Sequence, residues 1–392
     1  MRTPNTKLAI RGRPASLCAV MADSRATAPR LRSLDALRGF DMLWIIGLSE
    51  FFIQLAGVTK IGWLETWAVQ MDHVAWEGIR VHDLIFPLFM FASGISVPYA
   101  LKPKLESGTP RGKLLAGIWR RVLVLVLLGV VYNGGLRFAG FGDQRFASVL
   151  GQIGIAYGVA ATVFLLTRTW RGRSAWCLGI MVAVTVLQLL IPVPGHGAGV
   201  LTPEGSINAW LDQHFLPGRR HEWAPYDPEG VLSVISACAL TLGGVLLGGH
   251  VRSWEKPSLT AATRLLIAGT ALLFVGWVCW HLGYPPIKKI WTTTFNLLAG
   301  GICTWLFVVF HLAVDFRPHS NWSFFLQVIG MNSITIYLAE KIVPFHLISE
   351  FFFGGVAAHS GNWSQVILTL GVLIIEWLVL YYLWRKNTFL RV

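Results

Sequence analysis

The chain has 392 residues, of which 54% are hydrophobic and only 14% are charged. Soluble globular domains carry about 25% charged residues, so this composition excludes an ordinary soluble protein and indicates an all-α integral membrane protein. The formal net charge of +13 does not call for a nucleic-acid partner, because basic cytoplasmic loops and anionic lipid already account for it.

Residues 1–29 are rich in Arg, Pro, Ala and Ser and contain no apolar core of signal-peptide length. We expect them to form a disordered cytoplasmic tail, with translation starting at Met1 or Met21. Residues 30–392 are expected to form one transmembrane domain, because long apolar segments follow one another throughout this range.

Apolar segments of bilayer-spanning length predict a polytopic bundle of about ten transmembrane helices. The predicted spans are residues 40–57, 83–101, 118–136, 149–167, 175–192, 231–250, 262–283, 292–314, 324–343 and 366–384. The shorter apolar segment 346–356 is interrupted by glycine and is expected to be re-entrant or interfacial.

The loops that join these spans differ in charge. The tails and loops on the side of the two termini carry 24 Lys and Arg residues, and those on the other side carry 8. Because cytoplasmic loops are enriched in Lys and Arg, we predict that both termini are cytoplasmic and that the loop containing His73 is extracytoplasmic.

A first polar group lies at the cytoplasmic start of the first span. The guanidinium of Arg38 suits phosphate geometry, and Asp35 and Asp41 can pair with neighbouring cations. Ordinary anchoring charges would explain most of this group. They explain Asp41 less well, because a carboxylate inside a span needs a partner.

A second group combines His73, Trp76, Glu77, His82 and Asp83 at the mouth of the second span. Imidazole titrates near neutral pH and a carboxylate can fix its tautomer, so His73 and Asp83 are the candidate catalytic residues. The alternative is that His73 is a satisfied surface histidine. A metal site is not expected, because the two histidines lack one-turn spacing and a third ligand.

A third group lies in the outer loop that contains Tyr226, Asp227 and Glu229, with Lys288 and Lys289 in the next outer loop. Paired acids beside an aromatic ring are suited to holding an amino sugar. The alternative is that this acidic segment simply caps the helix that follows.

Two further segments bear on packing. Asn332, Ser333, Glu340 and Lys341 put polar groups at bilayer depth and are expected to face the bundle interior. The small-residue run 243–249 permits close helix packing, either within the bundle or between the subunits of a homodimer.

Five motifs follow one another along the chain: the run 30–40, HVAWEG at 73–78, DLIFPLFMFASG at 83–94, YDPEG at 226–230 and GMNS at 330–333. In order and approximate spacing they resemble the signatures of the heparan-alpha-glucosaminide N-acetyltransferase family. A collinear set of this kind is much more specific than any single motif.

The resemblance implies a transmembrane acyltransferase that takes acetyl from cytosolic acetyl-CoA and delivers it to a glucosamine amine across the membrane. It also implies that His73 matches the family's active-site histidine, within a His-x-x-Trp-x-Gly motif. The human lysosomal relative has an extra lumenal region and first span, so this chain looks like a bacterial form, expected in the bacterial inner membrane.

Two positions depart from the family pattern. Ser49 and Glu50 stand where the family often has an asparagine late in the first span. The run 150–154 reads LGQIG where the family has LQRIG, so an arginine is lost. Roles proposed for those family residues in donor and acceptor binding therefore do not transfer unchanged.

The charge of acetyl-CoA suggests how the substrates bind. Its phosphates should meet basic residues at the cytosolic mouth, and its pantetheine arm should pass between helices toward His73. His73 would act as a general base, with Asp83 orienting its ring, or as a nucleophile that carries the acetyl group. The residues assigned to acetyl-CoA are Arg38, Arg120, Arg121, Asn332 and Ser333, and those assigned to the acceptor are Trp76, Glu50, Tyr226, Asp227, Glu229 and Lys289.

Two other functions are compatible with the sequence. A transporter of amino sugars or oligosaccharides would explain the charged residues inside spans, such as Asp41 and Glu376, although the chain shows no inverted repeat. An O-acetyltransferase of an envelope polysaccharide would use the same donor and histidine with a hydroxyl acceptor.

Overall fold

The computed structural model describes residues 31–134, 137, 140–254, 258–316 and 321–390. The expected tail 1–29, with both candidate start residues, lies outside these ranges, and so does Leu136, the expected last residue of the third span. Within the described ranges the chain forms helices and no strand.

The α-helices of the described ranges, in chain order, are α1 (Arg32–Leu43), α2 (Ser49–Thr59), α3 (Gly62–Gln70), α4 (Ile85–Glu106), α5 (Arg111–Tyr132), α6 (Val149–Leu166), α7 (Trp170–Leu190), α8 (Ile207–Phe215), α9 (Val231–Arg252), α10 (Leu259–His281), α11 (Thr293–Phe310), α12 (Phe324–Met331), α13 (Ser333–Ile342), α14 (Phe345–Ala358) and α15 (Ser364–Arg385). Nine helical segments among these residues are long and apolar enough to cross a membrane, and the bent pair α12–α13 gives a tenth. The expected all-α polytopic fold with about ten spans is confirmed.

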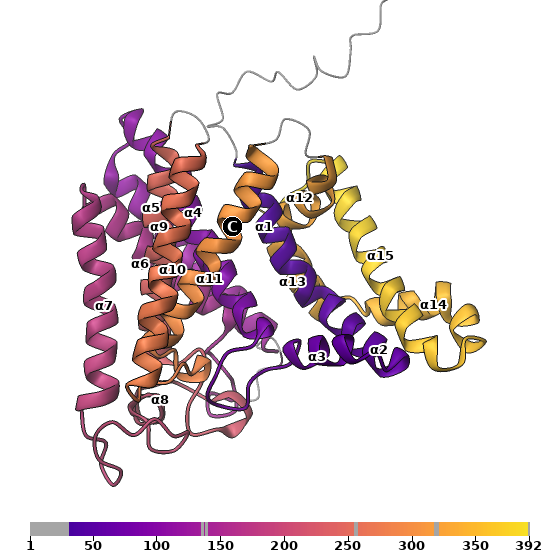
Figure 1. Cartoon of the computed structure of the whole chain (residues 1–392), viewed down its shortest axis with the longest axis horizontal. Helices are drawn as coiled ribbons and strands as arrows, with labels where there is room; N and C mark the ends of the chain where they lie inside the picture. The colour runs from indigo at the N-terminus through magenta and orange to yellow at the C-terminus, as the bar shows by residue number, and fades with distance from the viewer. Residues whose placement is uncertain (1–30, 135–136, 138–139, 255–257, 317–320, 391–392) are drawn as a thin grey trace, which may run out of the picture. The chain divides into compact units, whose positions relative to one another are not determined.

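The helices divide into an inner and an outer set (Figure 1). The inner helices α4, α6, α9 and α11 bury most of their apolar side chains against one another. The outer helices α5, α7, α10 and α15 leave large apolar side chains exposed, such as Leu178 of α7 and Phe274 of α10. A surface of this kind is suited to contact with lipid chains.

Helices α4 and α9 cross with almost no space between their backbones. A Cβ atom at Gly94 would lie 2.1 Å from the carbonyl oxygen of Thr241, and a Cβ atom at Gly244 would lie 2.1 Å from that of Phe91. Gly248, one turn further along α9, approaches α4 in the same way. Of the two alternatives for this part of the small-residue run, packing within the bundle is therefore the observed one.

The first span is longer than expected and is not a straight helix. It begins at Arg32 and passes through a π-helical turn, Trp44–Leu48, before it ends at Thr59. Gly47 in this turn has a φ of 127°, a conformation that glycine adopts without strain. Arg38 therefore lies inside the helix and not before it, contrary to the predicted start at residue 40.

The expected ninth span, 324–343, is broken in two. Helix α12 ends at Met331 and α13 begins at Ser333, with a bend of 59° between them. Asn332, at the junction, leaves the helical conformation, with φ −122° and ψ 25°. Hydropathy predicted the extent of this span, but it does not register a local change in backbone angles.

The shorter apolar segment 346–356 lies within α14, which is too short to be counted as a span. Helix α14 packs along α15.

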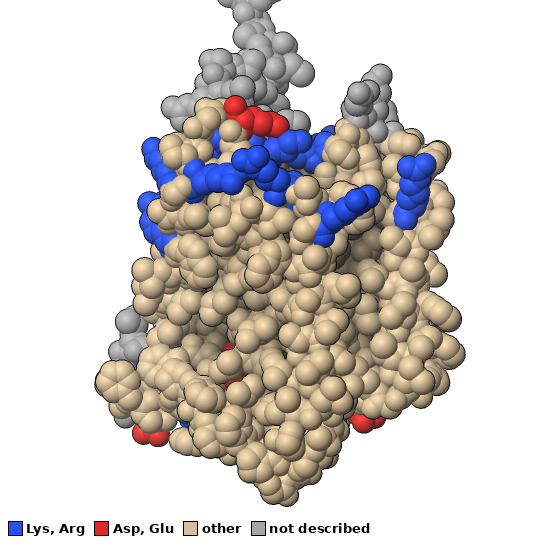
Figure 2. Space-filling view, turned by 90° about the vertical axis from the view of Figure 1, so that its left-hand side faces the viewer, with Lys and Arg blue, Asp and Glu red and all other residues tan. Residues whose placement is uncertain are grey.

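Lys and Arg side chains gather at one end of the helices. Figure 2 shows them as a band along the upper edge of one face, above a large area with few charged residues. This is the end at which α1 begins, whereas α2, α3, α8 and the loop that contains His73 lie at the opposite end (Figure 1).

Candidate active site

His73 and Asp83 are joined by a short hydrogen bond. His73 lies in the loop between α3 and the 3-10 turn Val81–Leu84, and its Nδ1 is 2.7 Å from Oδ1 of Asp83. The Asp83 side chain is 3% exposed, whereas the His73 side chain is 52% exposed. An ionised carboxylate can only accept, so Nδ1 of His73 donates this hydrogen bond, and Nε2 is the ring nitrogen that the bond leaves free.

The backbone fixes the orientation of the Asp83 carboxylate. Its second oxygen, Oδ2, accepts hydrogen bonds from the backbone N–H groups of Val74, at 3.3 Å, and Arg80, at 3.2 Å. Because both donors belong to the loop that carries His73, the loop wraps around the carboxylate. Asp83 thus holds the loop and the imidazole ring at the same time.

Lys288 adds a positive charge to this pair. Its Nζ lies 3.3 Å from Oδ1 of Asp83 and 3.3 Å from Nδ1 of His73. The motif-based prediction names its neighbour Lys289 and gives Lys288 no role. The position of Lys288 between a pair of prolines and a predicted span was the available signal, since prolines stiffen a loop.

His82 and Ser49 extend the cluster toward the first span. The rings of His73 and His82 lie edge to face, with centroids 4.6 Å apart. Oγ of Ser49 is 3.3 Å from Nδ1 of His82. Ser49, at one of the positions that depart from the family pattern, is therefore separated from His73 by a single side chain.

Trp76 and Tyr226, both assigned to the acceptor, contact each other. Their rings lie edge to face with centroids 5.1 Å apart, and Nε1 of Trp76 donates to the carbonyl oxygen of Leu201 at 2.8 Å. The two rings therefore form one aromatic contact between loops that are far apart in the sequence, and the Tyr226 side chain is buried in it.

Two other acceptor candidates, Glu50 and Lys289, have different neighbours. Glu50 is exposed and accepts a hydrogen bond from Gln54, so its described contacts do not reach His73. Lys289 is partly exposed and lies near enough to His221 and Lys288 for its charge to act on both.

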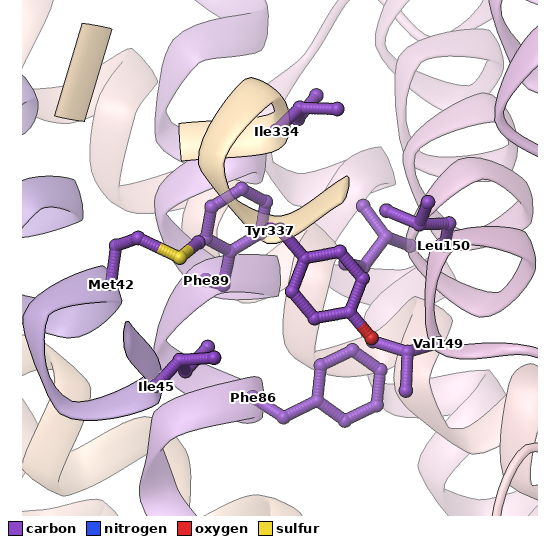
Figure 3. Close-up of a pocket in the computed structure, with 9 residues that line it drawn as sticks. Met42, Ile45, Phe86, Phe89, Val149, Leu150, Ile334 and Tyr337 are labelled. Carbon is purple, nitrogen blue, oxygen red and sulfur yellow. The ribbon is translucent and has the colours of Figure 1, made fainter. Parts of the chain in front are cut away.

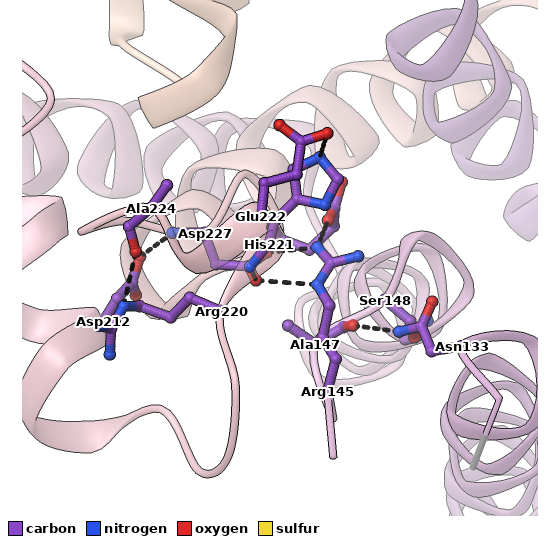
Figure 4. A network of polar contacts seen from close by, with 12 residues as sticks. Asn133, Arg145, Ala147, Ser148, Asp212, Arg220, His221, Glu222, Ala224 and Asp227 are labelled. Atoms are coloured by element: carbon purple, nitrogen blue, oxygen red, sulfur yellow. Dashed lines mark hydrogen bonds and ion pairs between the residues drawn. The ribbon is translucent and has the colours of Figure 1, made fainter. Parts of the chain in front are cut away.

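Arg145 binds both acids of the outer loop, Asp227 and Glu229. Figure 4 labels Arg145 and Asp227 in this network. Its Nε and one terminal nitrogen donate to the two oxygens of Asp227, at 3.0 and 2.7 Å, in a two-pronged pair. The same terminal nitrogen contacts the carboxylate of Glu229. Asp227 also accepts the backbone N–H groups of His221 and Glu229 and is fully buried. Arg145 is absent from the motif-based prediction.

Asp227 and Glu229 do not cap helix α9. The carboxylate of Asp212, from α8, accepts the backbone N–H groups of Asp227, at 2.9 Å, and of Val231, at 2.8 Å. The simpler alternative for the acidic segment was therefore wrong. An acid from another helix satisfies the first free N–H group of α9, and this leaves the two acids to Arg145.

The environment of the acids moves their pKa values apart. Burial, together with the charge of Asp227, raises the pKa of Glu229 to about 7. Burial would also raise the pKa of Asp227, but the hydrogen bonds and charge of Arg145 outweigh it and hold that pKa below its ordinary value. Burial raises the pKa of Asp212 to about 6. Of these three acids, Glu229 therefore has the pKa that lies nearest to neutral pH.

The candidates for acetyl-CoA binding fall into two places. Arg38 donates to the carbonyl oxygen of Ala92 at 3.4 Å and lies within electrostatic range of Arg121, which stacks on the ring of Tyr157 at 4.4 Å. Arg120 is exposed. The first two arginines therefore come together.

Asn332 and Ser333 are buried at the bend between α12 and α13. The adjoining Gly330 packs against α1, where its Cβ would lie 1.9 Å from the carbonyl oxygen of Asp35. The described contacts thus bring this bend to the first half of α1.

A small apolar pocket lies between α1, α4, α6 and α13. Its lining residues are Met42, Ile45, Phe86, Phe89, Val149, Leu150, Ile153, Ile334 and Tyr337. In Figure 3 the ring of Tyr337 extends from α13 with its hydroxyl group toward Val149 of α6. The pocket is suited to an apolar chain. Within the described ranges, no group of three or more His, Cys, Asp and Glu residues could hold a metal ion.

This fold and this site define a polytopic membrane protein with a histidine, a carboxylate and an ammonium group gathered at one end of its helices. Residues 30–213 match the catalytic-domain model of heparan-alpha-glucosaminide N-acetyltransferase. This match confirms the resemblance carried by the motifs.

Two curated proteins show the same relationship. The chain is 24% identical over 422 residues to human heparan-alpha-glucosaminide N-acetyltransferase, across 94% of this chain and 60% of the human protein. It is 23% identical to the mouse protein, across 94% of this chain and 61% of the mouse protein. The chain therefore spans about three fifths of the length of these relatives.

Proposed function

We propose that the protein is a transmembrane N-acetyltransferase that moves an acetyl group from acetyl-CoA to the amine of a glucosamine-type sugar. The observation that carries the proposal is the contact between His73 and the buried carboxylate of Asp83, inside the segment that matches the acetyltransferases. A histidine held in this way can act as a general base or as a nucleophile.

In the direct reaction, the amine nitrogen forms a bond to the carbonyl carbon of the thioester while Nε2 of His73 takes the proton that the amine loses. The carbon–sulfur bond breaks, and the thiolate of CoA leaves and takes up a proton. Asp83 stabilises the imidazolium that forms. In the nucleophilic version, Nε2 attacks the thioester carbon and the thiolate of CoA leaves. The amine then attacks the acetyl carbon, the bond from that carbon to Nε2 breaks, and Nε2 takes the proton that the amine loses.

The donor is proposed to enter from the cytosol, at the end of the bundle where Lys and Arg gather. The count of 24 against 8 basic residues supports cytoplasmic termini. Arg38 and Arg121 are the candidates for the phosphates of acetyl-CoA, because guanidinium groups bind phosphate with two hydrogen bonds. The apolar pocket between α1, α4, α6 and α13 would accept part of the pantetheine arm.

The acceptor is proposed to bind at the opposite end, with Trp76 and Tyr226 against the apolar face of the sugar. Glu229 lies near Lys288 and would supply a polar contact beside the histidine. The location proposed for the reaction is the inner membrane of a bacterium, with the sugar on the extracytoplasmic side.

The first test uses purified protein, labelled acetyl-CoA and glucosamine. We expect the wild type to form N-acetylglucosamine. His73→Ala should still bind acetyl-CoA and lose turnover by a factor of about 10² or more, because general-base assistance supplies about 10² to 10⁴ in rate. The control is His214→Ala, at an exposed histidine of α8, which should keep wild-type turnover.

Other outcomes would contradict the proposal. If the wild type forms no product and proteoliposomes accumulate an amino sugar, the protein is a transporter. If product analysis by mass spectrometry finds acetyl groups on hydroxyl oxygens alone, the amine assignment is wrong. Unimpaired turnover in His73→Ala would remove the proposed catalyst.

A further inference from the structure

Lys288 contacts both members of the proposed catalytic pair, and the function described above does not use it. Its Nζ lies 3.3 Å from Oδ1 of Asp83 and 3.3 Å from Nδ1 of His73. The Lys288 side chain is 21% exposed, so water screens its charge only in part. A charge at this distance acts directly on the protonation of an imidazole.

The loop that carries Lys288 is fixed to the loop that carries His73. The backbone N–H of Gly78 donates to the carbonyl oxygen of Pro286 at 2.9 Å. Ile287 and Ile290, on either side of the lysine, are fully buried. The ammonium group therefore has a defined position, unlike that of a lysine on a free surface loop.

The charge of Lys288 itself depends on its neighbours. Burial lowers the pKa of Lys288, and the charges of Asp83 and Glu229 act in the opposite direction. Because two carboxylates from different parts of the chain face this amine, they favour its ammonium form.

The charged and titratable groups that face His73 come from three segments. They are Asp83 and His82 of the 3-10 turn, Asp72 and Arg80 of its own loop, and Lys288 of the second loop. Arg80 donates to the carbonyl oxygen of His73 and pairs with Asp72, so much of its charge is neutralised away from the ring. The main opposition is between Asp83, which favours a protonated ring, and Lys288, which disfavours it.

We propose that Lys288 is a positioning residue of the acyltransferase site: its ammonium shares the carboxylate of Asp83 with His73 and thereby keeps the imidazole unprotonated near neutral pH. The inference rests on the proposed function of His73, which needs a free Nε2 lone pair. Without the ammonium, Asp83 would pair with His73 alone. A protonated ring would be stabilised, and Nε2 could then accept neither a proton nor an acetyl group.

The test follows the protonation of His73 and does not require acetyl transfer. Diethyl pyrocarbonate modifies unprotonated imidazole, and the His73 side chain is 52% exposed. Modification of His73 in the purified full-length protein can therefore be measured by mass spectrometry as a function of pH. Lys288→Gln removes the charge and Lys288→Arg keeps it. Lys60→Gln, at an exposed position, removes a charge elsewhere.

We expect the modification midpoint of Lys288→Gln to move upward by about 1 to 3 pH units, the effect of a charge at close range. Lys288→Arg and Lys60→Gln should keep the wild-type midpoint. Asp83→Asn should move the midpoint downward, because it removes the opposing charge. In the acetyl-transfer assay, kcat/KM should fall on the acidic side of its pH profile. For Lys288→Gln this fall should occur at higher pH than for the wild type, and raising the pH should restore activity.

A wild-type midpoint in Lys288→Gln would overturn the inference. An equal upward shift in Lys288→Arg would also overturn it, because loss of charge would not be the cause. If the midpoints move as expected but the wild type transfers no acetyl group, the proposed function fails while the effect of Lys288 on His73 stands.

Discussion

At the scale of single residues, Arg145 holds two carboxylates with one guanidinium. Asp227 is fully buried and the Glu229 side chain is 11% exposed, so neither acid can exchange this partner for water. Two acids and one base would leave a net negative charge in a poorly solvated place. The raised pKa of Glu229 relieves this charge near neutral pH.

Arg145→Ala should destabilise the protein, because it leaves buried carboxylates without their partner. Removal of one member of a buried ion pair costs about 3 to 5 kcal/mol in the free energy of unfolding. The measurement is the thermal midpoint of the detergent-solubilised protein. Arg137→Ala, at an exposed position before the same segment, is the control. Equal midpoints in the two variants would contradict a structural role for Arg145.

The stability should depend on pH through Glu229. Its pKa is raised from 4.5 to about 7 in the folded protein, so over this range the folded state binds a proton that the unfolded state has released. The free energy of unfolding should therefore fall as the pH rises toward about 7. Asp212, with its pKa raised to about 6, adds a change of the same sign at lower pH.

Thermal midpoints of the wild type and Glu229→Gln, compared between about pH 6 and pH 7, test this dependence. The wild type should lose stability across the interval, and the variant should lose less. Glu222→Gln, at an exposed acid of the same loop, should behave as the wild type. If the thermal midpoint of Glu229→Gln falls with pH as much as that of the wild type, another group must titrate in this range.

Some residues of the site could be predicted from the sequence, and others could not. His73 and Asp83 lie ten residues apart in one motif and are in contact. Lys288 is 205 residues from Asp83, and Arg145 is 82 residues from Asp227. Contacts of this range depend on how the helices pack, which a single sequence does not record. The sequence analysis therefore named Lys288 without a role and did not single out Arg145.

At the scale of helices, glycine sets how closely α4 and α9 approach. Apolar periodicity is sufficient to locate the spans, because bilayer length and hydropathy are both local properties. It does not reveal the π-helical turn Trp44–Leu48 or the bend at Asn332, which arise from backbone angles. The prediction was therefore confirmed for the existence of the spans and did not extend to their shape.

Gly244→Ala should separate α4 from α9, because its Cβ would lie 2.1 Å from the carbonyl oxygen of Phe91. Overpacking of a buried contact costs about 1 to 3 kcal/mol, which a lowered thermal midpoint would report. In Gly249→Ala the new Cβ would lie 4.0 Å from Pro98, an ordinary contact, so this control should keep the wild-type midpoint. If Gly249→Ala also lowers the thermal midpoint, close contact between the helices is not the cause of the effect of Gly244→Ala.

At the scale of the whole molecule, the proposed reaction requires its two substrates to approach from opposite ends of the bundle. Basic residues gather at one end, and the loop of His73 lies at the other (Figures 1 and 2). Since the charge asymmetry predicts which end is cytoplasmic, the orientation can be tested independently of activity.

Single cysteines in a cysteine-free background provide this test. Glu65→Cys in α3 should react with a membrane-impermeant thiol reagent in intact cells. Ser107→Cys, between α4 and α5, should react only after the cells are permeabilised; both positions are exposed. The reverse pattern would place His73 in the cytosol and exclude acetyl transfer across the membrane.

The hydrogen bond from Gly78 to Pro286 has a consequence for biosynthesis. His73 and Asp83 belong to the segment 30–213, whereas Asp227, Glu229 and Lys288 are translated later. A nascent chain halted after residue 213 would contain the histidine and its acid without the cation that faces them. His73 should therefore reach its full reactivity only when the second half of the chain has been inserted. If the two halves are expressed separately, His73 should reach this reactivity only after the halves reassemble.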